Sequence, residues 1–408
     1  MTEQSQRALG DVRVLDLTNE SGLYCTKLLA DLGADVIKIE PPGGDPTRSI
    51  GPFLNDEPSP ERSLFFFHFN TNKRSITLDI ETRDGQEIFR RLAATADVIV
   101  ETFSPGYLDD RCIGYEALHS LNPRLIVTSI TPFGQRGPYR NYPATDLTAL
   151  ALGGVLLECG WPDRPPVTLG ALQAYHQVGG QAATGTLVAL LARDATDAGQ
   201  HVDVSIQASM PVCLLTRIPT FMATGDYEGR GGDIHRSSLN GVFPCRDGYV
   251  DIRFRPRAGR WQRVLQWIVE AGMAQDLTDE KYVEFKYRSV PENAQHIDAV
   301  FREFFMTMGK EELMDTAQRN GFEVGAIYTA EDLLRDPQLV ARRFFVDVEH
   351  QDLDRNLTYT GSPYRHSETP WSISRRPPNI GEHTGSILGE ELGLGSAELL
   401  TLKRTGVI

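Results

Sequence analysis

Two adjacent cations, Lys73 and Arg74, stand among amide and hydroxyl side chains in the segment 70–75 (NTNKRS). Lysine and arginine supply positive charge, and Asn72 supplies amide hydrogen bonds. Together these groups can hold phosphate. A solvated turn before a strand has the same composition, and the local residues by themselves favour that simpler interpretation.

A second candidate is the segment 101–106 (ETFSPG), which follows the short apolar run 98–100. Open α/β sheets bind ligands at the carboxyl ends of their strands, where this segment is expected. Proline and glycine are also common in ordinary turns at that place. His176 and His235 also allow a functional and a simpler interpretation. Each is more typical of a structural or solvent-exposed histidine than of a catalytic one.

The turn 18–22 (TNESG) lies between a predicted strand and a predicted helix, the place of a dinucleotide fingerprint. That fingerprint needs G-x-G-x-x-G so that the backbone can approach a pyrophosphate. Here Gly22 is the one glycine, and Glu20 adds a negative charge. The turn therefore argues against an NAD or FAD site.

The elements that must position these residues alternate between strand and helix. Such alternation predicts βαβ units and a parallel sheet with right-handed crossovers. The expected strands are Val12–Leu17, Val36–Glu40, Ile76–Leu78, Val98–Val100, Leu125–Ser129 and Val202–Ile206, and the helices between them include Tyr24–Leu32, Arg83–Ala94 and Tyr115–Ser120. We expect a large, Rossmann-like α/β domain over residues 1–224.

The second half of the chain has a different pattern. Strands on either side of Arg246–Gly248 predict a hairpin, and Arg260–Gln318 is mostly helical in pattern. We expect a smaller α+β domain over 225–330. The segment 331–408 has short strands and several prolines, which is typical of a chain laid over another surface.

The composition excludes several classes of protein. The 408 residues carry 41 lysines and arginines against 55 acids, a net charge of −14, which argues against binding nucleic acid or an anionic membrane. The longest charge-free run, Pro165–Ala192, is too polar for a membrane span. Five scattered cysteines show no metal-ligand spacing. With no signal-peptide pattern at the N-terminus, the sequence predicts a cytoplasmic protein without a structural metal.

Ten segments in chain order resemble the family III CoA-transferases, the formyl-CoA transferase or CaiB/BaiF type. Each motif is weak alone, and their order gives them weight. They are Val14–Thr18, Leu32–Glu40, Asn72–Ile76, Asp97–Glu101, Leu121–Arg124, Gly134–Tyr139, Gly199–Ser205, Gly241–Cys245, Asp336–Leu339 and Gly381–Thr384.

The resemblance implies a ring-shaped chain, with a Rossmann-like domain joined to a small domain, and two such rings interlocked as a dimer. The segment 331–408 would then return to the large domain and to the dimer partner. CoA would be held by the large domain near Asn72, Lys73, Arg74 and Phe103, which favours the phosphate interpretation of Lys73 and Arg74. CoA thioester is a substrate in this family, and no separate cofactor is implied.

The family mechanism is covalent. An aspartate attacks the acyl-CoA thioester, and the mixed anhydride that results is converted by the CoA thiolate into an enzyme–CoA thioester. An acceptor carboxylic acid then enters, and the steps run in reverse. A carboxylate is needed because its carbonyl carbon must accept the thiolate.

This chain departs from the family at the nucleophile. The family aspartate precedes a helix that corresponds here to Gly179–Arg193, and Tyr175 stands at its position. Neighbouring positions carry no carboxylate. A phenol, with a pKa of about 10, has no carbonyl to form a thioester, so Tyr175 is expected to be inactive.

Nearby residues refine the comparison. Asp146 matches a supporting acid of the transferases. The α-methylacyl-CoA racemases of the family place a histidine before it, where Thr145 stands here, so racemase activity is not expected. Glu20 lies near the position of a glutamine that orients the family nucleophile. Gly229, Gly231 and Gly232 match the glycine-rich loop that closes over family active sites, since glycine allows the backbone to move.

Three interpretations follow from the missing aspartate. In the preferred one, the chain is one subunit of a two-subunit CoA-transferase, as in the succinyl-CoA:benzylsuccinate CoA-transferases, and a paralogous partner supplies the aspartate. In the second, a displaced carboxylate such as Glu158 or Asp163 acts instead. In the third, the chain binds acyl-CoA without catalysis.

Overall fold

The computed structural model describes residues 7–227, 229–230, 238–254 and 259–408. Contacts divide the chain into two compact units. The first comprises residues up to Leu157, Val167–Glu228 and Ala341–Ile408, and the second comprises Glu158–Pro166 and Gly229–Val340. The sequence predicts domain boundaries between residues 224 and 225 and between residues 330 and 331. These boundaries remain predictions.

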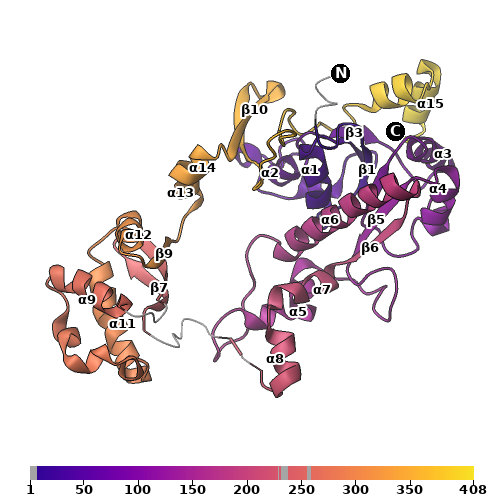
Figure 1. Cartoon of the computed structure of the whole chain (residues 1–408). Coiled ribbons are helices and arrows are strands. Elements are labelled where there is room, and N and C mark those ends of the chain that lie inside the picture. The colour runs from indigo at the N-terminus through magenta and orange to yellow at the C-terminus, as the bar shows by residue number, and fades with distance from the viewer. Residues whose placement is uncertain (1–6, 228, 231–237, 255–258) are drawn as a thin grey trace. The chain divides into compact units, whose positions relative to one another are not determined.

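The first unit is built on a six-stranded parallel sheet (Figure 1). Its strands are β1 (Arg13–Leu17), β2 (Asp35–Glu40), β3 (Arg74–Thr77), β4 (Val98–Glu101), β5 (Ile126–Thr131) and β6 (His201–Ser205). They lie in the order β3-β2-β1-β4-β5-β6. This is the doubly wound order, and its reversal point lies between β1 and β4. The α/β fold class predicted from the sequence is confirmed.

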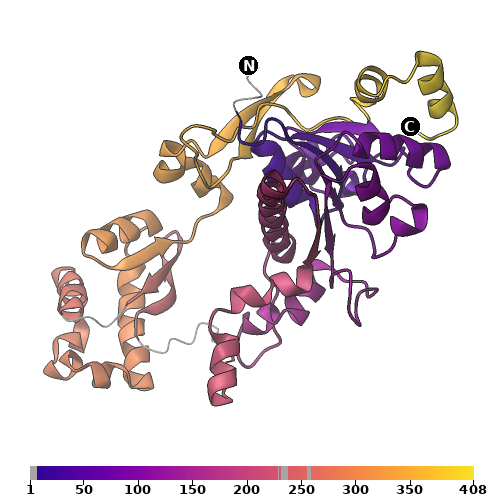
Figure 2. The same ribbon diagram turned by 45° about the vertical axis from the view of Figure 1, so that its right-hand side comes forward.

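Helices cover both faces of the sheet (Figures 1 and 2). Helices α1 (Leu23–Asp31) and α6 (Gln173–Thr196) pack on one face with Val14, Val36 and Val98. Helices α3 (Arg83–Ala93), α4 (Tyr115–Leu121) and α15 (Ser396–Arg404) pack on the other with Leu15, Ile37 and Ile99. Successive strand residues face opposite layers, as the period of two in a strand requires.

A glycine sets the distance between α1 and α6. A Cβ at Gly179 would lie 2.8 Å from the Tyr24 Cβ, so a side chain at this position would push the helices apart. The remaining helices of this unit are α2 (Leu64–Phe69), α5 (Asp146–Leu152), α7 (Ile206–Ser209) and α8 (Arg217–Thr224). Single 3₁₀ turns connect several of them: Pro46–Ser49, Leu54–Asp56, Asp109–Arg111, Val155–Glu158 and Pro211–Leu214.

The C-terminal segment covers the β3 edge of the sheet. The backbone N–H of His383 donates to the Ser75 carbonyl at 2.8 Å, and the N–H of Thr77 donates to Thr384 Oγ1 at 3.1 Å. An uncovered edge strand would expose unpaired backbone groups. This segment also contains the hairpin β10 (Phe345–His350) and β11 (Arg355–Thr360), a 3₁₀ turn at Gln351–Leu353 and a π-helix at Gly385–Glu391.

The second unit is a small α+β body with its own aromatic core around Phe243, Trp267 and Phe301. Its antiparallel sheet is β7 (Asn240–Cys245), β8 (Gly248–Arg253) and β9 (Glu323–Ala326), which confirms the predicted hairpin. The helices are α9 (Arg260–Glu270), α10 (Phe285–Arg288), α11 (Pro291–Phe305), α12 (Lys310–Arg319), α13 (Ala330–Arg335) and α14 (Pro337–Ala341), with 3₁₀ turns at Gln275–Thr278 and Glu280–Val283. Within the described ranges, no helix is both long and apolar enough to cross a membrane.

Candidate active site

A cavity of about 270 Å³ lies at the carboxyl ends of β1, β2, β3 and β4. In open α/β sheets, ligands bind at this edge, at the point where the strand order reverses. Phe103 and Tyr107 line it from the segment that follows β4, with their rings stacked at a centroid distance of 4.3 Å. Ile39 and Leu78 add apolar surface from the ends of the neighbouring strands. The cavity can therefore take a flat, largely apolar group.

The loops after β1 and β4 are joined at this reversal point. The backbone N–H of Asn19 donates to Thr102 Oγ1 at 2.9 Å. A Cβ at Gly22 would lie 2.7 Å from the methyl groups of both Thr18 and Thr102, so only glycine fits between them. The single glycine of this turn therefore serves loop packing, which agrees with the absence of a dinucleotide fingerprint.

Buried charges hold the turn after β1. Asp16 accepts hydrogen bonds from the Thr18 N–H at 2.9 Å and from Lys73 Nζ at 2.8 Å. Lys38 Nζ in turn donates to the Thr18 carbonyl. Burial alone would raise the pKa of Asp16, but Lys38 and Lys73 outweigh it and hold that pKa well below its usual range. The carboxylate stays charged and fixes the turn.

Glu101, at the end of β4, fixes the segment that carries Phe103. Its carboxylate accepts the Phe103 N–H at 2.6 Å and faces Ser129, whose Oγ lies 2.9 Å from His201 Nε2. The Glu101 side chain is buried, and this burial raises its pKa to about 7. Phe103 is therefore positioned through a titratable group.

A cation, Arg111, lies beside Tyr107 but outside the residues that line the cavity. The guanidinium of Arg111 lies 3.6 Å from the centre of the Tyr107 ring and pairs with Glu81 at 2.7 Å. Tyr107 Oη also donates to Glu81. Arg111 thus places positive charge beside the aromatic wall, where it can meet an anionic group of a ligand.

Tyr175 lies in the first turn of α6 and is buried. Burial, together with the charges of Glu20 and Asp146, raises the pKa of its phenol to about 12. The phenol is therefore neutral at physiological pH.

Asp146 is the carboxylate at the N-terminus of α6. Its Oδ1 accepts the backbone N–H groups of Ala174 at 2.8 Å and Tyr175 at 3.1 Å. Unpaired N–H groups make the N-terminus of a helix favourable for negative charge. Asp146 satisfies two of these groups, and its expected role as a supporting acid stays a prediction.

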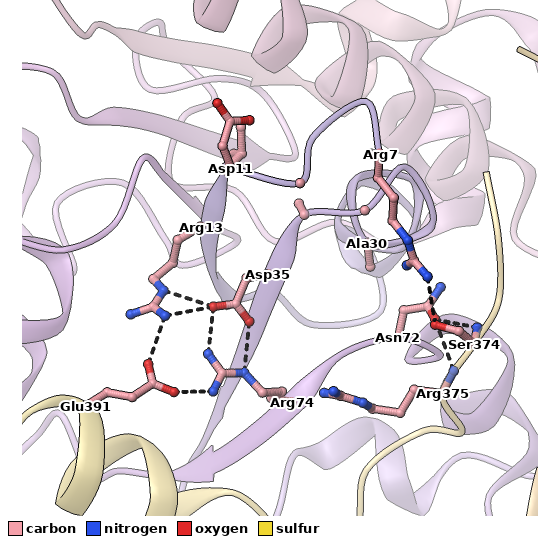
Figure 3. A pocket seen from close by; sticks show the side chains of 14 residues that line it. Arg7, Asp11, Arg13, Ala30, Asp35, Asn72, Arg74, Ser374, Arg375 and Glu391 are labelled. Atoms are coloured by element: carbon pink, nitrogen blue, oxygen red, sulfur yellow. Dashed lines mark hydrogen bonds and ion pairs between the residues drawn. The ribbon is translucent and has the colours of Figure 1, made fainter. Parts of the chain in front are cut away.

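The structure separates the residues predicted to bind CoA. Phe103 lines the cavity at the carboxyl edge of the sheet, whereas Asn72 and Arg74 line another cavity at the amino ends of the strands (Figure 3). Lys73 has no exposed surface, and its ammonium group bonds to Asp16, Thr26 and Asn70. An ammonium group held in this way has no free surface for a ligand phosphate, so the predicted clamp is not assembled here.

The displaced carboxylates and the glycine-rich loop fall elsewhere. Glu158 and Asp163 belong to the second unit, whose placement relative to Tyr175 is not determined. Gly229 is also in that unit, with no atom near enough to contact a Cβ there. Gly231 and Gly232 lie outside the described residues.

Sequence reasoning singled out the segments that contain Thr102 and Asn19, but it did not join them with the other residues around Phe103. The missed residues include Ile39, Leu78 and Tyr107, which lie at or just beyond the ends of neighbouring strands. The expected strand boundaries contained a usable signal, because the carboxyl ends of parallel strands meet at one edge. No group of three or more histidine, cysteine, aspartate or glutamate side chains in the described part of the chain could hold a metal.

Comparison with known proteins identifies the family. The model of CoA-transferase family III matches residues 9–384. The chain belongs to this family. It is 36% identical to succinyl-CoA:(R)-benzylsuccinate CoA-transferase subunit BbsE of Thauera aromatica, covering 97% of both chains. It is 33% identical to succinyl-CoA–D-citramalate CoA-transferase of Chloroflexus aurantiacus, covering both chains completely.

A solved structure agrees with the family assignment. A CaiB/BaiF family protein from Brucella suis matches with a TM-score of 0.83 and 30% identity, covering 94% of this chain and 98% of that one. The resemblance inferred from the ten segments is confirmed. As a family III member, the chain is a transferase that acts among acyl-CoAs and carboxylic acids.

Proposed function

We propose that the chain is a CoA-transferase subunit that moves CoA between an acyl-CoA, such as succinyl-CoA, and a carboxylic acid, with a paralogous subunit supplying the aspartate. The observation that carries this proposal is Tyr175, a neutral phenol in the first turn of α6. The name of the Thauera relative, a subunit, supports a two-subunit enzyme.

The cavity at the reversal point is the proposed site for the adenosine end of CoA. Phe103 and Tyr107 would stack against the base, and Arg111 would meet the phosphates. This assignment keeps Phe103 as a CoA-binding residue. Lys73 is fully buried against Asp16, whereas Arg111, although paired with Glu81, keeps 23% of its side chain exposed. Arg111 therefore replaces Lys73 as the proposed source of positive charge.

Transfer requires a carboxylate that can be acylated and can then form a thioester with CoA. In the proposed enzyme this group comes from the partner, and the present chain contributes Asp146 and the loop around Gly229 only as supporting parts. The chain alone then binds CoA and forms no covalent intermediate.

The deciding experiment measures CoA transfer from succinyl-CoA to a panel of carboxylic acids, with the chain alone and with its co-encoded paralogue. Hydroxylamine or borohydride treatment followed by peptide mass spectrometry locates any acyl or CoA adduct. We expect turnover only with the paralogue and an adduct only on the paralogue. An adduct on Glu158, Asp163 or Asp146 of this chain alone would instead establish a displaced nucleophile.

The third interpretation, acyl-CoA binding without catalysis, gives a different result. Such a protein binds succinyl-CoA but shows no turnover with any paralogue or acceptor. Isothermal titration calorimetry run beside the activity assay separates this case from a chain that fails to bind CoA.

We also propose that the chain associates as an interlocked dimer with a second family III chain. Large apolar side chains are exposed on the first unit, including Leu191 on α6, Leu215 before α8 and Met222 on α8. These exposed side chains are available for contact with a second chain, and the family resemblance supports such an association. Sedimentation at nanomolar concentration should give twice the mass of one chain, and a monomer would contradict the proposal.

A further inference from the structure

The largest cavity described, about 730 Å³, lies at the amino ends of β1, β2 and β3. This is the opposite edge of the sheet from Phe103. Four arginines line the cavity: Arg7, Arg13, Arg74 and Arg375 (Figure 3). Such a gathering of cations is notable in a chain with a net charge of −14.

Two of the four arginines are neutralised within the protein. Arg13 donates to Asp35 at 2.9 Å and pairs with Glu391 at 2.8 Å. Arg74 pairs with the same two carboxylates, at 2.6 Å for Asp35. The positive charges of Arg13 and Arg74 are therefore balanced by the two carboxylates. This network of ion pairs holds its part of the cavity lining in place.

The other two arginines have no carboxylate partner among the described residues. Arg7 donates to Ser374 Oγ at 3.3 Å, and the Arg375 side chain extends toward Arg74 (Figure 3). Partial burial and the neighbouring charges of Arg74 and Arg7 lower the pKa of Arg375, although Asp35 and Glu382 act in the opposite direction. The third acid of the lining, Asp11, points away from the four guanidinium groups in Figure 3. An anion between Arg7 and Arg375 would relieve this repulsion.

Asn72 holds this part of the cavity in place. Its Oδ1 accepts the backbone N–H groups of Ser374 at 2.9 Å and Arg375 at 3.2 Å, and its Nδ2 donates to Asp31 at 2.7 Å. The segment that carries Arg375 is therefore fixed before any ligand arrives. A preformed site loses less conformational entropy on binding.

We propose that this arginine pocket binds a phosphate-bearing anion at a site separate from the CoA cavity. Guanidinium groups bind phosphate oxygens in pairs of parallel hydrogen bonds, and the volume is in the range of small-molecule sites. The proposed ligand is a free phosphate compound. Occupation of the pocket by the phosphates of CoA is the competing outcome, which a titration in the presence of CoA separates.

The experiment is calorimetric titration of the full chain with inorganic pyrophosphate at constant ionic strength. Each lost charge-assisted contact should weaken binding about tenfold. We expect Arg7→Ala/Arg375→Gln to weaken it at least tenfold. The matched control, Arg355→Ala, removes an exposed arginine of the same unit outside the cavity and should leave the affinity unchanged.

Two results would overturn the site. Binding that survives in Arg7→Ala/Arg375→Gln, or that weakens equally in Arg355→Ala, would show general attraction to positive surface. Circular dichroism checks the fold of each variant. If the double variant unfolds, Arg375→Gln alone decides the question, because its side chain is exposed.

A second titration identifies the source of the phosphate. Pyrophosphate is titrated into protein saturated with CoA. Unchanged affinity supports a separate site, whereas loss of binding would assign the arginine pocket to CoA and overturn the proposal. These readouts are independent of transferase activity, so failure of the two-subunit function would leave them intact.

Discussion

The two edges of the parallel sheet differ in the kind of group they present. At the carboxyl edge, Phe103 and Tyr107 form an aromatic wall, and no lysine or arginine is among the residues that line that cavity. At the amino edge, four arginines share a cavity with few apolar side chains. The first suits a ring, and the second suits an anion.

Lys73 and Arg74 show how neighbours in sequence come to serve opposite edges. The Lys73 side chain runs into the interior and joins Asp16, which fixes the turn at the carboxyl edge. The Arg74 side chain joins Asp35 and Glu391 at the amino edge. Two adjacent cations are therefore not one phosphate clamp, because each has a different carboxylate partner.

The largest expected effect is on the unfolding free energy when Lys73, the cation that serves the carboxyl edge, is replaced. Lys73→Met leaves the buried Asp16 with less compensation, which should cost about 3–5 kcal/mol of unfolding free energy. The matched variant Arg74→Met should cost only about 1 kcal/mol, since Asp35 is partly exposed and keeps Arg13. Urea denaturation measures both, and equal losses would refute the internal role of Lys73.

A pH-dependent effect is expected at Glu101. Its pKa is raised from 4.5 to about 7 by burial, so between these pH values the folded protein keeps a proton that the unfolded chain has released. Stability therefore falls as pH rises through this window, by about 3 kcal/mol in total. Denaturation of wild type and Glu101→Gln at pH 4.5 and 7.5 checks this. The fall should be absent in the variant, and identical profiles would contradict the assignment.

A smaller effect is expected at the aromatic wall. Phe103→Ala removes one ring from the proposed adenosine site and should weaken CoA binding by about tenfold, since stacking of a base on an aromatic side chain contributes about 1–3 kcal/mol. Calorimetry with CoA measures it. Tyr139→Ala, an exposed aromatic residue outside this cavity, is the control. Equal affinity in Phe103→Ala and wild type would remove the adenosine assignment.

The smallest effect is expected at Tyr175. Tyr175→Phe removes only the hydroxyl, which has no step to perform if a partner supplies the aspartate. Transfer by the reconstituted complex should stay within about twofold of wild type, a difference of about 0.4 kcal/mol in activation free energy. A loss of a hundredfold or more in kcat would show that the phenol takes part in the reaction.

Much of the fold followed from local patterns. Short apolar runs separated by helical segments predicted the parallel sheet, because the central strands are buried on both faces and each connection needs a crossover helix. The ten segments then gave the family. Tyr175 could likewise be placed by counting from Gly179, and the structure puts it in the first turn of α6.

The partners of charged residues depended on the tertiary structure. Nothing near Lys73 in the sequence indicates that Asp16, 57 residues away, accepts its hydrogen bond, or that Arg74 meets Glu391, which lies 317 residues away. Sequence determined the elements and their order, since these depend on local hydrophobic periodicity. The three-dimensional packing decided which cations are buried and which line a cavity, because burial depends on residues brought together from distant parts of the chain.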